Sequence, residues 1–171
     1  MSICSDCASL KRDCCHMRGS PAHKFGLTGA DLLRITKATG QRPDEYSVLE
    51  RVPRYVQQSM ESALHGIGRM FPGGMRTALK FDGPDNACHF LGTGGCSLDM
   101  NTRPRFCALY PSWYVGDEIR AGALAPSSRC MAVGDSDGSK TLLYQLIGTS
   151  SAQVAHLARE SDRELGKMSV Q

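Results

Sequence analysis

The sequence lacks long apolar runs, and aromatic residues make up only 6% of its 171 residues, with a single tryptophan. A membrane-spanning helix needs about 18 or more consecutive apolar residues, so we expect no membrane span and no membrane partner. The segment MSICSDCASLKRDCC also holds no apolar stretch followed by the small-residue cleavage site of a secretory leader. These absences predict a cytoplasmic protein.

The common catalytic motifs are missing as well. The sequence contains no G-x-S-x-G, no H-E-x-x-H, no P-loop and no glycine fingerprint after a clear strand. The acids in the middle of the chain are predicted to form turns rather than to act as general acids or bases: Asp82, Asp85 and Asp99. Catalytic residues are therefore unknown, and whether the chain is an enzyme stays open.

The formal net charge of +3 does not point to an acidic partner. This value counts every cysteine as a neutral thiol, and metal binding would change it. Eight thiolates around two zinc ions would give about −1, and four thiolates around a cluster core of charge about +2 would give about +1. We therefore expect no nucleic acid partner, and a protein partner is unknown.

Cysteine is what the sequence has in abundance, with eight residues. The spacing is C-x2-C-x6-C-C in an N-terminal arm, then C-x7-C-x10-C in the central span 87–111, then one isolated cysteine. In a reducing cytoplasm a chain this rich in cysteine is predicted to bind metal rather than to form structural disulfides. The predicted ligands are all eight: Cys4, Cys7, Cys14, Cys15, Cys88, Cys96, Cys107 and Cys130.

The spacing favours an iron–sulfur cluster slightly over zinc. Two facing C-x2-C knuckles, typical of zinc fingers, are missing, whereas iron–sulfur proteins often combine a close pair with thiolates from distant loops. Zinc stays open, as two four-cysteine sites or a site with shared thiolates. Because neighbouring side chains of an extended backbone point to opposite sides, Cys14 or Cys15 is the first candidate for a non-ligand, followed by Cys130. A four-ligand centre in the central span also needs Cys130 or the arm.

Basic residues beside the cysteines are further candidates. His16 and His89 each follow a cysteine directly and are secondary candidates for nitrogen ligands. Arg103 and Arg105 precede Cys107, and one of them is expected to stabilise the negative charge of a thiolate cluster. We name Arg103 as the residue expected beside the cofactor, with binding of an anionic substrate and simple solvation as the alternatives.

The hydrophobic pattern predicts an α+β protein: a small, helix-rich single domain over 1–171, with a short hairpin or small sheet and a cysteine–metal cluster that joins the arm to the central loops. Residues 51–80 are expected to form a helical insertion, and residues 140–168 the C-terminal helices. Strands are expected at 75–81 and 118–121, with a hairpin between Cys88 and Cys96. The remaining helices are expected at 29–39, from Pro43 through Leu49, at 55–66 and from a cap at Thr102.

Two of these helices have expected inner faces. Helix 29–39 begins with a capping-box-like Thr28-Gly-Ala-Asp31 and ends at Gly40. Its apolar face is predicted to be Leu32, Leu33 and Ile35. Helix 55–66 carries an apolar stripe that we expect to pack in the core rather than to form a binding groove: Val56, Met60, Ala63 and Leu64.

The whole pattern resembles the YkgJ-type cysteine-cluster family, whose eight-cysteine proteins are regarded as zinc- or iron-chelating. The resemblance covers about residues 4–130 and rests on C-x2-C…CC in the arm, LTGADLLRI from Leu27, and C-x-F-L…G-C-S-L…R-P-x-x-C-x-x-Y-P from Cys88 to Pro111. It implies metal chelation with an unassigned cellular role. The chain departs from the family at Ala108, where arginine is common, and at Leu98-Asp99, where an apolar residue and tyrosine are usual.

Two alternative functions follow from the same residues. A similar cluster occurs in flagellin lysine methylases, so one alternative is a metal- or thiol-dependent enzyme of redox or methyl-transfer type, with an open metal position near Cys107 and Arg103. The other is a protein-interaction module that uses a purely structural metal.

Overall fold

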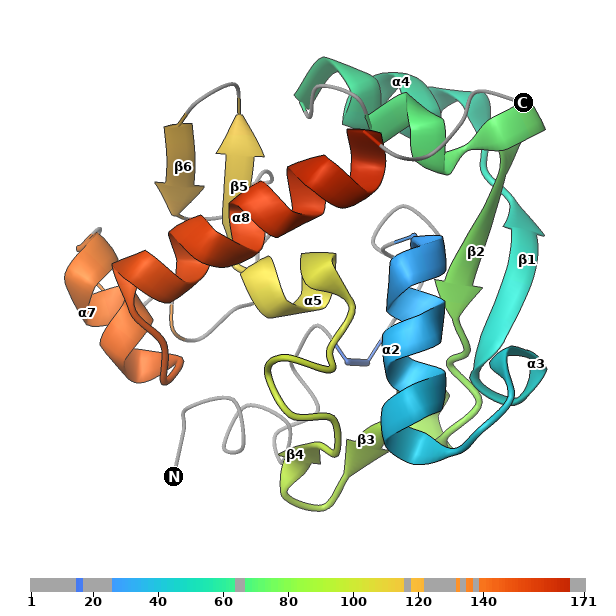
Figure 1. Cartoon of the computed structure of the whole chain (residues 1–171), viewed down its shortest axis with the longest axis horizontal. Helices are drawn as coiled ribbons and strands as arrows, with labels where there is room; N and C mark the ends of the chain where they lie inside the picture. The colour runs from blue at the N-terminus through green and yellow to red at the C-terminus, as the bar shows by residue number, and fades with distance from the viewer. Residues whose placement is uncertain are drawn as a thin grey trace.

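The structure is a computed structural model that describes residues 15–16, 26–63, 67–115, 118–121, 132, 135–136 and 139–166. These residues form a small α+β domain in which helices alternate with short antiparallel strand pairs (Figure 1), as the hydrophobic pattern predicts. None of the described helices has the length and apolar character needed to cross a membrane.

Helix α2 (Gly29–Thr39) begins and ends where the sequence predicts. The hydroxyl of Thr28 accepts a hydrogen bond from the backbone N–H of Asp31, and the carboxylate of Asp31 accepts one from the backbone N–H of Thr28. This reciprocal pair is a capping box, and it satisfies backbone donors that the first turn leaves open. Gly40 ends the helix in the left-handed conformation, with φ 73°.

The buried face of α2 differs from the predicted one. Ile35 is fully buried as expected, but Leu33 is 75% exposed, and Leu32 is half-buried. The inner position is taken by Asp31, which is fully buried and hydrogen-bonded. The prediction for Leu33 is therefore wrong, because a polar contact and not an apolar one sets the rotation of the helix.

This rotation makes a matched pair of substitutions informative. We expect Ile35→Ala to lower the free energy of unfolding by about 2–5 kcal/mol, because it leaves a cavity in the core. Leu33→Ala, in the same helix, should change it by less than about 0.5 kcal/mol. Chemical denaturation of both variants measures the difference, and equal losses would contradict the observed rotation.

The helix predicted from Pro43 through Leu49 is wrong after its first turn. Helix α3 (Pro43–Tyr46) is a single turn, and the chain continues as strand β1 (Ser47–Arg51). β1 pairs antiparallel with β2 (Met75–Leu79), which confirms the strand predicted there. Glu50 lies opposite Arg76, whose guanidinium donates to Oε1 of Glu50 at 2.7 Å. This ion pair and the backbone hydrogen bonds between β1 and β2 stabilise the strand. They outweigh the helix-start residues Pro43, Asp44 and Glu45, which favour a helix in this part of the sequence.

Three helical elements connect β1 to β2: α4 (Arg54–Ala63), η2 (Ile67–Met70) and η3 (Pro72–Gly74). Because β2 follows them, the stretch 51–80 is not purely the helical insertion that the sequence predicts. Val56 is buried and Met60 packs against the same cluster, which confirms core packing for these two residues. Leu64 and the side chain of Ala63 lie outside what the structure describes.

The predicted hairpin between Cys88 and Cys96 is confirmed. It follows the short helix η4 (Pro84–Asn86) and consists of β3 (Leu91–Gly92) paired antiparallel with β4 (Gly95–Cys96). At Gly95 the backbone has φ 102°, a conformation that favours glycine. The hairpin pairs Leu91 with Cys96. It therefore brings the segment after Cys88 beside Cys96.

Helix α5 (Arg105–Leu109) begins later than the sequence predicts. Thr102 is not its cap, because its hydroxyl donates to the carboxylate of Asp99 at 2.8 Å. Asp99 also accepts from the backbone N–H groups of Asn101 and Thr102, and these hydrogen bonds lower its pKa. Asp99 is thus the turn former that was predicted, and Pro104 occupies the N-cap position.

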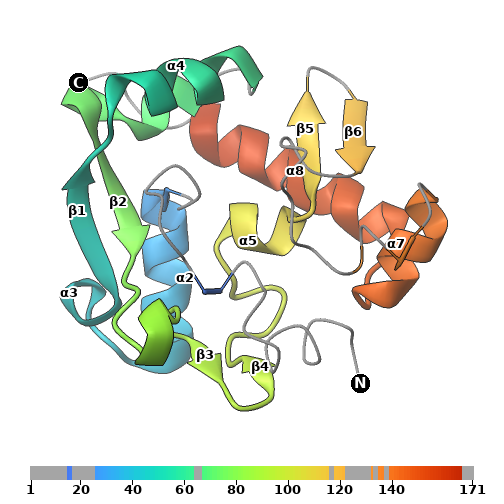
Figure 2. The same cartoon turned by 180° about the vertical axis from the view of Figure 1, so that it is seen from behind.

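Within the described residues of the C-terminal part lie one hairpin and the helices α7 and α8. Strand β6 (Glu118–Ala121) is confirmed, and it pairs with β5 (Ser112–Val115), a strand that the sequence analysis did not identify. Helices α7 (Lys140–Leu146) and α8 (Ser151–Gly166) are separated at Gly148, as predicted. Figure 2 shows α8 running from α7 towards α4 and passing α5.

Candidate metal-binding site

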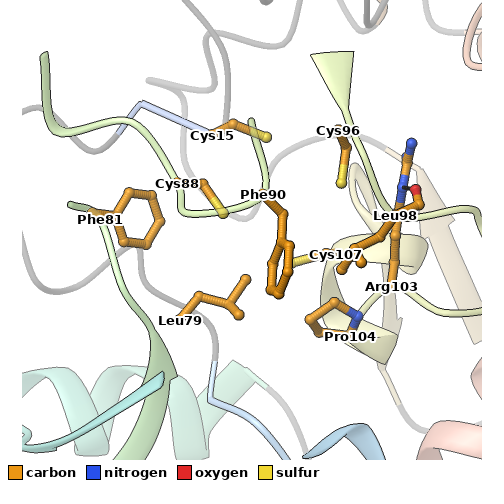
Figure 3. Close-up of a pocket in the computed structure, with 10 residues that line it drawn as sticks. All are labelled: Cys15, Leu79, Phe81, Cys88, Phe90, Cys96, Leu98, Arg103, Pro104 and Cys107. Atoms are coloured by element: carbon orange, nitrogen blue, oxygen red, sulfur yellow. Dashed lines mark hydrogen bonds between the residues drawn. The ribbon is translucent and has the colours of Figure 1, made fainter. Parts of the chain in front are cut away.

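The four cysteines that the structure describes line one cavity of about 70 Å³. They come from three segments: Cys15 from the arm, Cys88 and Cys96 from the hairpin region, and Cys107 from α5. Figure 3 shows their side chains directed into the same space. Arg103 also lines the cavity, and the rest of the wall is apolar: Leu79, Phe81, Phe90, Leu98 and Pro104.

The arm reaches the cavity through backbone pairing. His16 and Ala87 form an isolated antiparallel bridge, and the backbone N–H of Cys88 donates to the carbonyl of Cys15 at 2.6 Å. The arm and the central span therefore meet at Cys15 and Cys88, and Cys15 is one of the three cysteines considered as possible non-ligands. The other predicted ligands lie outside the described residues: Cys4, Cys7, Cys14 and Cys130.

Hydrogen bonds around the hairpin fix the positions of Cys88 and Cys96. The backbone N–H of Ser97 donates to the carbonyl of Phe90 at 2.8 Å, and its hydroxyl donates to the same oxygen at 3.0 Å. The N–H of Leu91 donates to the carbonyl of Cys88 at 2.8 Å. Phe90 is 5% exposed and lines the cavity, so its ring forms an apolar part of the wall (Figure 3).

A buried polar network anchors the start of α5, which carries Cys107. The backbone N–H of Arg105 donates to Oδ1 of Asp31 at 3.0 Å, and Nε of Arg105 donates to Oε1 of Glu164 at 3.1 Å. Arg34 forms ion pairs with both carboxylates. The network therefore joins α2, α5 and α8 directly beside the cavity. Arg105 belongs to this network. Of the two candidate arginines, Arg103 is the one that lines the cavity.

Asp31 is the centre of this network. Burial raises the pKa of its carboxyl, while hydrogen bonds from the backbone of Thr28 and Arg105 and the charge of Arg34 act in the opposite direction. The negative charge of Asp31 also contributes to the raised pKa of Cys107. No sequence motif predicts this network. The one local signal is Asp31 itself, which stands in the capping box where glutamate or glutamine is usual.

Three of the four cavity thiols have raised pKa values, which favours their protonated form. Burial raises the pKa of Cys88 to about 12, and burial also raises the pKa of Cys96 and Cys107. Repulsion between neighbouring thiolates acts in the same direction at all three positions. A metal would therefore have to displace protons from these thiols.

Arg103 is the one cation that lines the cavity within the described part of the chain. Its charge and its hydrogen bond lower the pKa of Cys96 against the larger effect of burial. Nε of Arg103 donates to the carbonyl of Leu98 at 3.0 Å, which fixes the guanidinium next to the hairpin. This is the place that the sequence predicts for a residue that offsets thiolate charge.

The two candidate histidines do not line the cavity. Nδ1 of His89 lies 3.3 Å from a carboxylate oxygen of Asp82, and its ring packs edge-on against Phe90. His16 takes part in the bridge to Ala87. Their positions favour a supporting role over metal ligation.

The chemistry of the donors fits a soft metal, since four thiols surround one space. Among the residues that the structure describes, no group of three or more histidine, cysteine, aspartate or glutamate side chains is arranged to hold one metal ion. Binding of a single ion would therefore require the thiols to move closer together.

Five predicted site residues meet at the cavity: Cys15, Cys88, Cys96, Cys107 and Arg103. The apolar wall and the network around Asp31 were not predicted. No protein family matches the chain, and neither characterised proteins nor solved structures show significant similarity to it.

Proposed function

We propose that this chain is a cytoplasmic metal-binding protein that holds an iron–sulfur cluster, or else zinc, through Cys15, Cys88, Cys96 and Cys107. The observation that carries the proposal is the lining of one cavity by four thiols from three separate segments. Thiolates are the usual protein ligands of iron–sulfur clusters and common ligands of zinc. The resemblance of the cysteine pattern to YkgJ-type proteins points to the same chemistry.

The size of the cavity favours the cluster. With Zn–S bonds of about 2.3 Å in a tetrahedron, the sulfurs around one zinc ion approach to roughly 3.8 Å. An iron–sulfur cluster contains several atoms and keeps its cysteine ligands further apart. A cavity of about 70 Å³ lined by four thiols has room for a cofactor of several atoms.

The walls of the cavity support the same assignment. Leu79, Phe81 and Phe90 shield the thiols from water, and solvent exposure is one of the factors that set the properties of a bound cluster. Four thiolates around a core of charge about +2 would leave a net charge of about −2. Arg103 offsets part of this charge from a position fixed by Leu98.

Anaerobic purification with visible absorption and metal analysis tests the proposal. We expect a coloured protein that contains iron and acid-labile sulfide, with absorption that bleaches on exposure to air or a chelator. A colourless protein that contains zinc alone would exclude the cluster and retain the site. A protein that takes up neither iron nor zinc under reducing conditions would contradict the proposal.

Zinc binding is also expected to depend steeply on pH. The pKa values of Cys88, Cys96 and Cys107 are all raised, so these thiols carry protons in the metal-free chain at neutral pH. Each zinc ion that binds should release about three protons from them, so its association constant should fall about 10³-fold for each unit decrease in pH. Competition titrations with a zinc indicator between pH 6 and 8 measure the slope. A slope near zero would contradict ligation by these thiols.

A further inference from the structure

We infer that Cys15 and Cys88 form a redox-reactive pair, which a small-molecule disulfide such as oxidised glutathione converts into an intramolecular disulfide in the metal-free chain. The bond itself is inferred from the backbone register and from the cavity that both side chains line. Its consequence for metal binding rests on the proposed function, because the bond would consume two of the four cavity thiols.

The register of the backbone places the two residues opposite each other. His16 pairs with Ala87 in an antiparallel bridge, so the next position along each segment pairs Cys15 with Cys88. The hydrogen bond from the N–H of Cys88 to the carbonyl of Cys15, 2.6 Å long, lies at this position. Directly opposite residues at a hydrogen-bonded position have Cα atoms about 5.5 Å apart, and disulfides most often span about 5.5–6 Å.

The side chains share one face of this pairing. Both residues line the same cavity, and Figure 3 shows both side chains at its rim. Cβ atoms of opposite residues are about 4.5–5.5 Å apart, whereas a relaxed disulfide needs about 3.8 Å. A small approach of the two segments is therefore required, so we expect a strained bond that thiols reduce easily.

The other described cysteines are less well placed for this reaction. Cys96 pairs across the hairpin with Leu91 rather than with a cysteine. Cys107 lies in α5, and its backbone takes part in that helix. Of the cysteine pairs in the described residues, Cys15 and Cys88 are the pair joined by a backbone hydrogen bond.

The reaction consists of two thiol–disulfide exchanges. Cys15 is half-buried and Cys88 is buried, so the more accessible Cys15 reacts first. Its thiolate attacks one sulfur of the oxidant, forms a mixed disulfide and releases one small thiol, which takes up the proton that Cys15 lost. Cys88 then loses its proton and attacks Sγ of Cys15, which releases the second small thiol. Two protein thiols are oxidised, and one small disulfide is reduced to two thiols.

Disulfide mapping tests the pair directly. The metal-free, reduced full-length chain is incubated with oxidised glutathione, remaining thiols are alkylated, and cross-linked peptides are identified by mass spectrometry. We expect the Cys15–Cys88 bond to be the main product and to disappear on addition of reduced glutathione. Cys15→Ser should abolish it, and Cys96→Ser, a matched cavity thiol, should leave it in place. A main product that joins Cys88 to any other cysteine, or a mixed disulfide that persists without a cross-link, would overturn the inference.

Zinc uptake by the oxidised chain tests the disulfide and the metal site separately. Zinc affinity is measured before oxidation, after oxidation and after re-reduction. We expect a loss of more than about tenfold that re-reduction restores, since two of four ligands are removed. If the bond forms and zinc affinity does not change, the pair is correct and the proposed metal site is wrong. If the reduced chain binds zinc and the bond does not form, the metal site stands and the pair is wrong.

Discussion

Replacement of Cys107 by serine is expected to lower metal affinity by more than two orders of magnitude. Loss of a hydrogen-bond partner of a metal ligand typically lowers affinity about 10–100-fold, and loss of a ligand itself should exceed that. Cys107 is the one described cysteine that reaches the cavity from α5. Titration of the reduced, metal-free protein with zinc or cobalt measures the effect.

Asn101→Ala is the matched control for this experiment. Asn101 is exposed and precedes α5 in the same loop, and it does not line the cavity. We expect its metal affinity to stay within about twofold of the parent, since surface substitutions have small effects. Circular dichroism of metal-free Cys107→Ser should match that of the parent, so that lost affinity cannot come from unfolding. Full affinity in folded Cys107→Ser would remove Cys107 from the site.

Asp31→Ala is expected to lower the free energy of unfolding by about 3–5 kcal/mol, because it removes one partner from a buried ionic network. The substitution takes away the acceptor for the backbone N–H groups of Thr28 and Arg105 and leaves Arg34 with less compensation. Denaturant titration at neutral pH measures the loss.

Asp44→Ala provides the comparison at an exposed carboxylate. The side chain of Asp44 is 70% exposed, and its ion pair with Arg42 lies at the surface. Exposed pairs of this kind contribute about 0–1 kcal/mol, so we expect a change of less than about 0.5 kcal/mol. If Asp31→Ala were as mild as Asp44→Ala, the network would not be what holds α2, α5 and α8 together.

The parts of the fold that the sequence predicts well are those with local causes. The capping box at Thr28 and the left-handed stop at Gly40 are fixed by residues within one or two turns of each other. The glycine-rich hairpin before Cys96 is equally local. In contrast, residues 47–51 form a strand because β2 lies beside them, and strand formation depends on such distant partners.

In the candidate site too, some features have local causes in the sequence and others depend on residues far apart in the chain. Cysteine spacing predicts that the arm and the central span meet, and Cys15 and Cys88 do so, whereas the metal ligands stay a prediction. The network behind Cys107 could not be predicted, since Thr28 and Glu164 are 136 residues apart and yet hydrogen-bonded. The exposure of Leu33 follows from this network too, because the buried position of Asp31 turns the apolar residue outwards.

The most direct test is the metal content of a variant in which four cysteines are replaced by serine together: Cys15, Cys88, Cys96 and Cys107. Iron, zinc and acid-labile sulfide are measured per chain after anaerobic purification, beside the parent protein. If these thiols form one site, the parent carries metal and the fourfold variant, which keeps its other four cysteines, carries almost none. Equal metal content in both proteins would show that the metal is held elsewhere.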